Sequence, residues 1–539
     1  MQQHKYKRKN TLNLITTAIL GISLMGCTDN STATSNHAKQ IEKKPFNAAD
    51  AKTFIETTEI ELTKLSQPAA QAAWAYQTYI NQDTAAVSAY LSEKYASKAS
   101  ELAKRAADFN DVEVDIDTRR KLDLLRNGLV LPAPSDPVKS GKYCRTEKDC
   151  LRLTDMNNIM ANERDPAVLL DIWKGWREVS PPMKALYQEE VTLANQGAEE
   201  LGFKDISQLW RGGYDMPADD FAIELDRLWT QIKPFYDALH CHVRAELGEE
   251  YGTDIVPQDQ PIPAHLLGNM WAQSWGNIYD IVKPEEPLDV IDVTAALAEK
   301  QYDEVKMVKQ AESFFSSLGF APLPDTFWER SMFSQPAERD VVCHASAWDI
   351  DEQDDLRIKM CIQLTGEEFS VIHHELGHNY YQRAYKELPM LYRGSANDGF
   401  HEAIGDTIAL SITPKYLKEI GLVNTIPDES NDIGMLLKLA LDKIAFIPFG
   451  LLVDQWRWKV FSGEVTPENY NTAWWELREK YQGVMAPVER PSDAFDPGAK
   501  YHVPSNTPYT RYFLAHVLQF QFHKHLCELA GNEEAIHRC

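Results

Sequence analysis

Apolar residues recur at helical spacing through most of this chain. The Ala-rich stretch of residues 69–109 contains neither Pro nor Gly, and residues 295–320 repeat apolar side chains at helical intervals as far as Gly319. Stripes of this kind bury one face of a helix, and core packing explains them most simply. The pattern predicts a mainly α-helical fold.

One segment shows the pattern of a β-hairpin. Residues 339–350 and 356–365 are strand-like and flank an acidic turn at 351–355. A bond between Cys343 and Cys361 would join the two strands. The sequence therefore predicts a small sheet within the helical fold.

The edge of this hairpin is a candidate surface for an extended peptide. A peptide backbone paired with it would meet His344 and the backbone of Ala345. A purely structural hairpin would show the same pattern.

Two histidines follow the hairpin on a predicted helix at 369–382. At 3.6 residues per turn, His374 and His378 share a face, so both imidazoles could reach one metal ion. Glu375 lies beside them and is free to act on a water molecule held by that ion. A surface helix with two solvated histidines is the alternative.

The second predicted helix, at 398–412, offers a third ligand. Glu402 and Asp406 are four residues apart on one face, and a glycine-containing turn could fold this helix back against the first. We expect Glu402 to bind the metal and Asp406 to orient a ligand imidazole from the second shell. A capping or solvated acidic pair is the alternative.

The N-terminus predicts export. Four Lys and Arg residues precede the apolar stretch from Leu12 to Leu24, which ends at Met25, Gly26 and Cys27. This segment resembles a bacterial lipoprotein signal, which implies cleavage before Cys27 and lipid attachment there. A secretory signal without a lipid is the alternative. We expect a signal peptide at 1–26, a lipidated tether at 27–45 and one catalytic domain at 46–539.

Charge excludes one class of partner. The formal net charge is −25, and removal of the four positive residues of the signal lowers it to −29. Nucleic-acid binding is therefore not expected. The signal instead predicts a bacterial cell-envelope protein in the periplasm, anchored to a membrane by its lipid, with no obligate protein partner.

The cysteines agree with an exported protein. Apart from Cys27, six of them form short-range candidate pairs and one is left over. We expect three disulfides and a buried thiol at Cys241. The candidate pairs are Cys144 with Cys150, Cys343 with Cys361, and Cys527 with Cys539.

Six motifs in one order identify a family resemblance that runs from about residue 50 to the C-terminus. The chain resembles the M2 family of zinc dipeptidyl carboxypeptidases, the family of angiotensin-converting enzyme. The motifs are WAQSW, CHASAWD, HHELGH, GFHEAIGD, FGLLVDQWRW and PYTRYF. The resemblance implies two helical subdomains around a deep central cleft, a small hairpin near one zinc ion per chain, and an N-terminal helical lid that admits flexible oligopeptides.

The resemblance also implies roles for individual residues. His374, His378 and Glu402 would bind zinc, and Glu375 would act as general base and acid on a zinc-bound water. Tyr512 would donate to the developing oxyanion. Substrate backbone would be held by His502, His344 and Ala345.

The peptide C-terminus would be held by three further residues. By resemblance, Gln273, Lys500 and Tyr509 grip the terminal carboxylate, since a cation and two neutral donors suit that group. A relative that releases one residue has Arg at the Gln273 position. Gln here favours release of dipeptides.

Departures from the family pattern affect chloride and substrate preference. One chloride site would comprise Arg211, Trp474 and Arg478, whereas the second pairs Arg511 with a Tyr, for which His242 stands here. Chloride activation is therefore left open. Thr507 and His516 replace apolar pocket residues, although Phe446 and Phe449 remain, so a preference for large apolar side chains would be weaker.

The leading prediction is a zinc peptidyl-dipeptidase. Another HExxH peptidase, such as an aminopeptidase or a one-residue carboxypeptidase, is the rival within enzymes. A peptide-binding lipoprotein is the rival from another class, and it would need neither Glu375 nor a metal.

Overall fold

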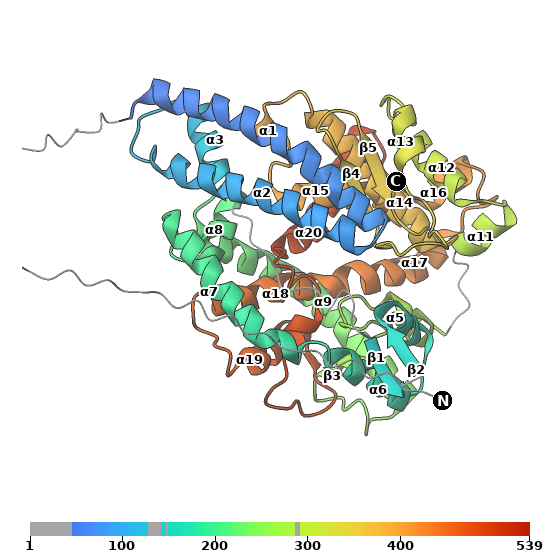
Figure 1. The fold of residues 1–539 in the computed structure, drawn as a ribbon. Helices are drawn as coiled ribbons and strands as arrows, with labels where there is room; N and C mark the ends of the chain where they lie inside the picture. The colour runs from blue at the N-terminus through green and yellow to red at the C-terminus, as the bar shows by residue number, and fades with distance from the viewer. Residues whose placement is uncertain (1–45, 128–141, 147–148, 286–290) are drawn as a thin grey trace, which may run out of the picture. The chain divides into compact units, whose positions relative to one another are not determined.

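The computed structural model describes residues 46–127, 142–146, 149–285 and 291–539. The chain divides into two units, Met1–Pro45 and Phe46–Cys539, and the described residues all belong to the second (Figure 1). The predicted signal peptide, Cys27 and the tether lie outside the described residues.

Helices dominate the described residues, as the sequence predicts. Three antiparallel or parallel strand pairs complete the fold: β1–β2, β3–β6 and β4–β5. The α-helices are α1 (Ala48–Thr78), α2 (Gln82–Ala107), α3 (Ile116–Asn127), α5 (Leu153–Asn162), α6 (Pro166–Arg177), α7 (Lys184–Glu200), α8 (Ile206–Arg211), α9 (Ala218–Tyr251), α10 (Tyr279–Val282), α11 (Val293–Glu299), α12 (Glu304–Ser317), α13 (Asp325–Arg330), α14 (Gly366–Tyr385), α15 (Asp398–Leu410), α16 (Pro414–Glu419), α17 (Asp432–Leu439), α18 (Ala445–Phe461), α19 (Tyr470–Leu477) and α20 (Thr510–Leu529). The strands are β1 (Lys142–Thr146), β2 (Asp149–Arg152), β3 (Ile262–Pro263), β4 (Ser346–Asp349), β5 (Leu356–Lys359) and β6 (Val484–Met485).

Both long helical stretches of the sequence are interrupted. Within 69–109, α1 ends at Thr78 and α2 begins at Gln82, capped by Asn81, whose side-chain oxygen accepts hydrogen bonds from the backbone N–H groups of Asp83 and Thr84. Within 295–320, Asp303 caps α12 in the same way after Gln301 adopts a positive φ of 53°. These short polar side chains accept hydrogen bonds from free backbone amides at the start of a new helix, which stabilises that start.

The predicted hairpin is confirmed. β4 and β5 pair in antiparallel register, with Ser346 opposite Lys359 and Asp349 opposite Leu356. The strands are shorter than the strand-like sequence around them. Cys343 and Cys361, just outside the paired residues, form the predicted disulfide.

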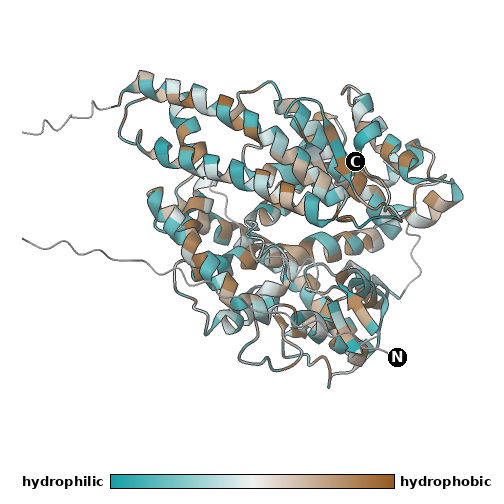
Figure 2. Cartoon of the chain, in the orientation of Figure 1, coloured by the Kyte–Doolittle hydropathy of each residue, from teal (hydrophilic) through white to brown (hydrophobic). Residues whose placement is uncertain are grey.

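Two large hydrophobic clusters form the core of Phe46–Cys539. One joins residues of α5 to α7, α9, α18 and α19 with buried residues of the segment 484–509 that precedes α20, and the other joins α11 to α14, β5 and α16. Along α1 and α2, hydrophobic and hydrophilic residues are mixed, and their apolar faces form a separate cluster with α3 (Figure 2).

The helices that carry the predicted site pack directly on one another. α14 packs against α15 and β4, α15 packs along α20, and α20 packs on α18. Two of the N-terminal helices, α1 and α3, contact the loop between α14 and α15 at the 3-10 turn Met390–Tyr392. A role for these helices as a lid stays a prediction.

All three predicted disulfides are present, but the thiol of Cys241 is exposed, not buried. The buried positions of α9 near it are Tyr236, Leu239, Val243 and Leu247, which fall on the opposite face. Helical periodicity thus turns Cys241 outward.

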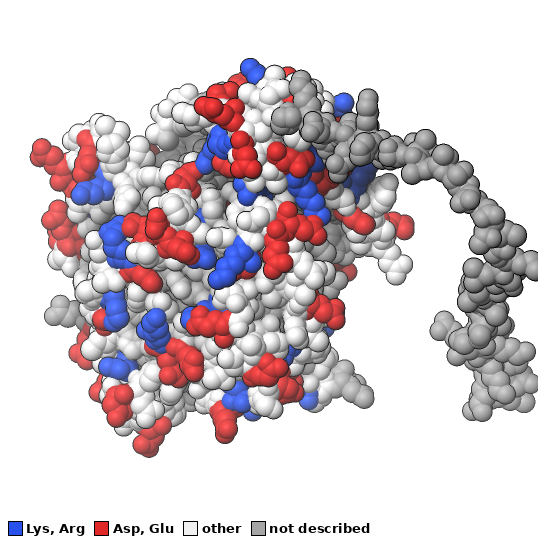
Figure 3. Space-filling view, turned by 90° about the vertical axis from the view of Figure 1, so that its left-hand side faces the viewer, with Lys and Arg blue, Asp and Glu red and all other residues white. Residues whose placement is uncertain are grey.

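The surface of the described residues is mixed in charge. On the face shown in Figure 3, acidic and basic side chains are interspersed. Among the described residues, no helix is both long enough and apolar enough to cross a membrane.

Candidate active site

Two neighbouring helices supply the predicted metal ligands. His374 and His378 lie one turn apart on α14, and Glu402 lies on α15. The Nε2 atoms of the imidazoles are 2.9 Å apart, and Oε2 of Glu402 lies 3.6 Å from His374 Nε2 and 3.9 Å from His378 Nε2. The structure brings together the three ligands that the sequence predicts.

Two glycines allow this close approach. A Cβ atom on Gly377 would lie 2.8 Å from Cα of Gly405, and a Cβ atom on Gly405 would lie 2.8 Å from Nδ1 of His374. Closely packed interiors leave no room for such contacts, so a larger residue would separate the helices or displace the imidazole. The glycines therefore set the distance between Glu402 and the histidines.

The donor set fits a zinc ion. Two imidazole nitrogens and a carboxylate oxygen are ligands of catalytic zinc, with bonds of about 2.0–2.2 Å. Such bonds place two ligands of a tetrahedral ion about 3.4 Å apart. The three ligand atoms here all lie within 4.8 Å of one another, and their side chains are largely buried.

Asp406 lies where the sequence predicts, one turn after Glu402. Its Oδ1 is 3.2 Å from Nδ1 of His374, so the carboxylate can hold the Nδ1–H tautomer and leave Nε2 for a metal. Lys443 Nζ approaches the same oxygen at 3.5 Å, and Gln519 Nε2 donates to Oδ2 at 3.3 Å. Asp406 is thus fixed from three sides.

His378 has a different partner, which the sequence analysis did not identify. Its Nδ1 lies 2.8 Å from Nδ1 of His401, and His401 Nε2 lies 3.1 Å from the hydroxyl of Tyr385. His401 is part of the GFHEAIGD motif, but within that motif the sequence analysis predicted a metal ligand only at its neighbour Glu402. His374 therefore contacts a carboxylate, whereas His378 contacts the imidazole of His401, which in turn contacts the Tyr385 hydroxyl.

These partners separate the pKa values of the ligands. Burial would lower the pKa of His374, but its hydrogen bonds to Asp406 and Glu402 raise it to about 10. Burial lowers the pKa of His378 to about 3. Burial would raise the pKa of Glu402, yet the hydrogen bond with His374 and the neighbouring histidines lower it to about 2, so Glu402 is ionised.

Glu375 is buried beside the ligands without binding them. Only 7% of its surface is exposed, and its Oε2 has no hydrogen-bond partner among the described residues. Burial raises its pKa to about 7, against the opposing charge of His374. A carboxyl group poised near neutral pH is suited to accept and return a proton.

His502 and Tyr512 lie together near the ligands. Their side chains approach at 3.3 Å, between His502 Nε2 and the Tyr512 hydroxyl. Burial raises the pKa of Tyr512, and the charges of Glu402 and Glu375 add to that rise, so the phenol keeps its proton. His502 is kept neutral because burial lowers its pKa far below the usual value.

Gln273, Lys500 and Tyr509 form a second group. Lys500 Nζ donates to Oε1 of Gln273 at 2.7 Å and lies 5.4 Å from the centre of the Tyr509 ring. No carboxylate among the described residues pairs with Lys500, and burial lowers its pKa to about 7. A buried ammonium group with aromatic walls suits the carboxylate of a ligand.

The start of β4 lies on the other side of Glu375. His344 is exposed, and its Nδ1 lies 2.8 Å from the carbonyl oxygen of Ala345. The buried Lys359 Nζ donates to the carbonyl oxygens of Val342 and His344 at 2.8 and 2.6 Å. Lys359 thus holds the segment that contains both predicted substrate contacts.

The structure does not bring Arg211 to Trp474 and Arg478. Arg211 instead contacts the backbone of Ser207 and the carboxylate of Asp219. Arg211 ends the short helix α8, whose other polar contacts are local, and this placement was not visible from sequence.

Arg177 is the guanidinium that lies near Arg478. Burial lowers the pKa of both to about 9, and the charge of Arg478 lowers that of Arg177 further. Arg478 lies over the rings of Phe449 and Trp474, and its Nε and Nη2 have no hydrogen-bond partner among the described residues. Two buried cations with unused donors suit an anion.

Arg511 already has an anion. Asp398 Oδ2 lies 2.9 Å from Arg511, and the hydroxyl of Tyr214 donates to Asp398 Oδ1 at 2.6 Å. His242 is elsewhere, with its Nε2 2.8 Å from the carbonyl oxygen of Val282. The tyrosine near Arg511 is therefore Tyr214, and a carboxylate of the chain itself lies between the two.

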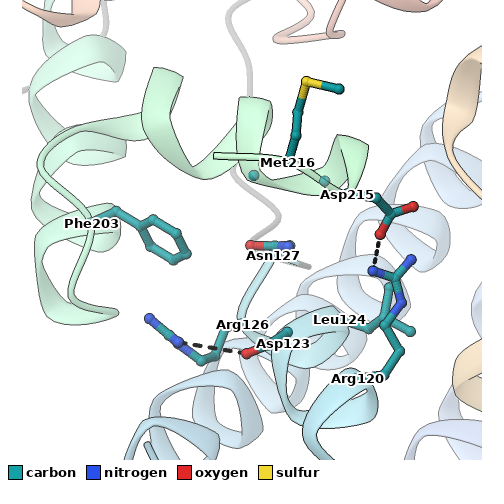
Figure 4. A pocket seen from close by; sticks show the side chains of 10 residues that line it. Arg120, Asp123, Leu124, Arg126, Asn127, Phe203, Asp215 and Met216 are labelled. Atoms are coloured by element: carbon teal, nitrogen blue, oxygen red, sulfur yellow. Dashed lines mark hydrogen bonds and ion pairs between the residues drawn. The ribbon is translucent and has the colours of Figure 1, made fainter. Parts of the chain in front are cut away.

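Two other features carry no metal or substrate chemistry in the described residues. His523 lies near Cys527 and Cys539, but those cysteines are joined as a disulfide. A cavity of about 390 Å³ lies between α3 and the turn Gly212–Tyr214 (Figure 4). The charge of Arg120 in its wall is neutralised by an ion pair with Asp215.

The fold and the site define a class: a mainly α-helical chain that presents two HExxH histidines and a glutamate from the next helix is a zinc metallopeptidase. The peptidase M2 family, described as angiotensin-converting enzyme, matches residues 46–539. The chain belongs to this family.

Comparison with individual relatives agrees with this family assignment. The chain is 44% identical over 497 residues to the angiotensin-converting enzyme of Oryctolagus cuniculus, a match that covers 87% of this chain and 37% of the relative. For the enzyme of Bos taurus, identity is 42%, with 91% and 39% covered. For that of Theromyzon tessulatum, identity is 41%, with 91% and 83% covered. The chain thus spans well under half of the mammalian relatives.

Proposed function

We propose that this protein is a zinc-dependent peptidyl-dipeptidase that releases dipeptides from the C-termini of oligopeptides. The observation that carries the proposal is the convergence of His374, His378 and Glu402, with Glu375 beside them, whose Oε2 has no hydrogen-bond partner among the described residues. The relatives named angiotensin-converting enzyme support it.

The residues divide the chemistry among themselves. His374, His378 and Glu402 would hold zinc, which when bound supplies a Lewis acid that polarises a carbonyl and activates water. Glu375 takes a proton on its free oxygen and returns it to the leaving amine. Asp406 keeps the proton of His374 on Nδ1, so Nε2 stays available.

The remaining groups orient the peptide. The Tyr512 hydroxyl, held protonated and supported by His502, donates to the carbonyl oxygen as negative charge develops. His344 and Ala345 contact the peptide backbone at the edge of β4. Lys500, with Gln273 and Tyr509, binds the terminal carboxylate, so the position of the cleaved bond is fixed relative to the C-terminus of the peptide.

An N-blocked tripeptide tests the reaction. Dipeptide release predicts a blocked amino acid and a free dipeptide, identified by mass spectrometry. A single free C-terminal residue would instead show a one-residue carboxypeptidase. If neither product forms and the peptide is only bound, the protein is a binding lipoprotein.

Chloride binding is proposed at one site. Arg177, Arg478 and Trp474 surround it, whereas Asp398 takes the place of an anion at Arg511. Chloride should then raise activity by binding near Arg177 and Arg478, and not by binding at Arg511. Arg478→Met should remove the response to chloride, and Asp398→Asn should leave Arg511 free and increase the response.

The cell-envelope placement is proposed from the N-terminal sequence, which lies outside the described residues. The segment Leu24–Cys27 resembles a lipoprotein cleavage site, so the mature protein would be bound to a membrane through lipid on Cys27 in a bacterial periplasm. Cys27→Ala should release the protein from the membrane fraction while its specific activity is unchanged.

A further inference from the structure

The imidazole of His516 lies between Asp406 and Phe446. On one side its Nδ1 lies 4.0 Å from Oδ2 of Asp406, the carboxylate that holds His374. On the other side its ring stacks on Phe446 at 4.3 Å, and Phe446 lies 6.1 Å from the ring of Tyr509. His516 therefore lies along the path from the metal ligands to the group that would bind the terminal carboxylate.

The hydrogen bonds of His516 determine which nitrogen carries its proton. Nδ1 is 2.8 Å from the carbonyl oxygen of Tyr512, and the Asp406 carboxylate is the next group that it faces. Both groups are acceptors, so Nδ1 must donate. Burial also lowers the pKa of His516, which favours the neutral ring. Nε2 is then an acceptor.

Nε2 is available to a ligand. Among the described residues it has no hydrogen-bond partner, while 12% of the side chain is exposed. The charged groups around the ring are Asp406 on α15 and Asp442 and Lys443, which precede α18. Two carboxylates and one ammonium group disfavour an added negative charge.

We infer that His516 is a specificity-determining residue that selects peptides whose C-terminal side chain carries a neutral hydrogen-bond donor. The donor binds Nε2 while the terminal carboxylate binds Lys500. This inference rests on the proposed function, because it concerns the residue next to that carboxylate.

Three N-blocked tripeptides that end in Asn, Leu or Asp test it, since their side chains are nearly equal in shape. Asn has a donor, Leu has no polar group, and ionised Asp has acceptors only. Wild-type protein should cleave the Asn peptide with a kcat/KM about three- to tenfold above the Leu peptide, and should cleave the Asp peptide least.

His516→Phe keeps a ring to stack on Phe446 but removes the acceptor. The Asn-to-Leu ratio of kcat/KM should fall about three- to tenfold. His516→Gln, which keeps an acceptor, should restore part of it. His525→Phe is the matched control, because this histidine lies on the same helix with 69% of its side chain exposed, and its ratio should equal that of wild type.

The ratio does not depend on the fraction of active protein, so a partly unfolded variant still gives a valid result. An unchanged ratio in His516→Phe would overturn the inference, as would wild-type preference for Asp, which requires a protonated ring. The proposed function fails separately, if none of the three peptides releases a dipeptide.

Discussion

The proposed metal-binding region and the proposed carboxylate-binding region of this protein are built in different ways. The metal region draws His374, Glu375, His378, Glu402 and Asp406 from two consecutive helices. The carboxylate region joins Gln273 to Lys500, which is 227 positions away in the chain. Helical spacing alone thus arranges most of the metal region, whereas long-range packing forms the other.

The two regions also differ electrostatically. Each charged group of the metal region has a charged or imidazole neighbour, while Lys500 donates to Gln273, lies near aromatic rings and forms no ion pair with a carboxylate of the described residues. Changes in the metal region should therefore affect the chemical step or metal affinity, and changes at Lys500 should affect substrate binding. Four experiments separate these effects.

Glu375→Gln should have the largest effect. The amide keeps the shape of the side chain but cannot carry the proton, so kcat should fall by about 10²- to 10⁴-fold. Zinc content, measured by metal analysis, should be unchanged because His374, His378 and Glu402 remain. Unchanged turnover would contradict the role of Glu375.

Lys500→Met should weaken substrate binding and leave the metal in place. Loss of a charge-assisted hydrogen bond should lower kcat/KM by about 10- to 100-fold, mainly through KM. A peptide with an amidated C-terminus provides the control, since it has no carboxylate to lose. An equal loss with both peptides would place Lys500 outside the carboxylate region.

Asp406→Asn should lower zinc affinity by about 10- to 100-fold, because His374 loses the carboxylate that fixes its tautomer. Competition with a chelator measures this loss without reference to activity. Asp442→Asn is a suitable control, because Asp442 is more exposed and contacts Lys443 rather than a ligand. Equal affinities for Asp406→Asn and wild type would remove Asp406 from the metal region.

Proton binding by Lys500 should give the smallest effect. Burial lowers its pKa to about 7 in the free protein, and only the ammonium form attracts a carboxylate. KM should therefore rise about fivefold between pH 7 and pH 8, and at higher pH it should not exceed the KM of Lys500→Met. Lys500→Arg keeps its charge at these pH values, so its KM should show a much flatter profile.

Several predictions from sequence depended only on spacing and succeeded. The helices that carry His374 and Glu402, the hairpin with its Cys343–Cys361 bond, and the other two disulfides all follow from local patterns. Local patterns succeeded because a hairpin or a helix face involves residues that are near in the chain.

Other predictions failed where the outcome depended on distant partners. Arg211 was assigned beside Arg478, but Arg177 lies there, and Tyr214 rather than His242 lies near Arg511. The sequence analysis made no prediction about the breaks before α2 and α12, which the caps Asn81 and Asp303 mark in the structure. No sequence spacing distinguishes one buried arginine from another.

The sequence by itself determined the family to which the chain belongs, and it predicted the metal ligands and the general base. Only the tertiary structure decided that Gly377 and Gly405 bring the two helices into contact, that Asp398 pairs with Arg511, and that His516 lies between Asp406 and Phe446. Spacing along a helix fixes which side chains share a face, but the distance between faces depends on side-chain volume at contacts far apart in the chain.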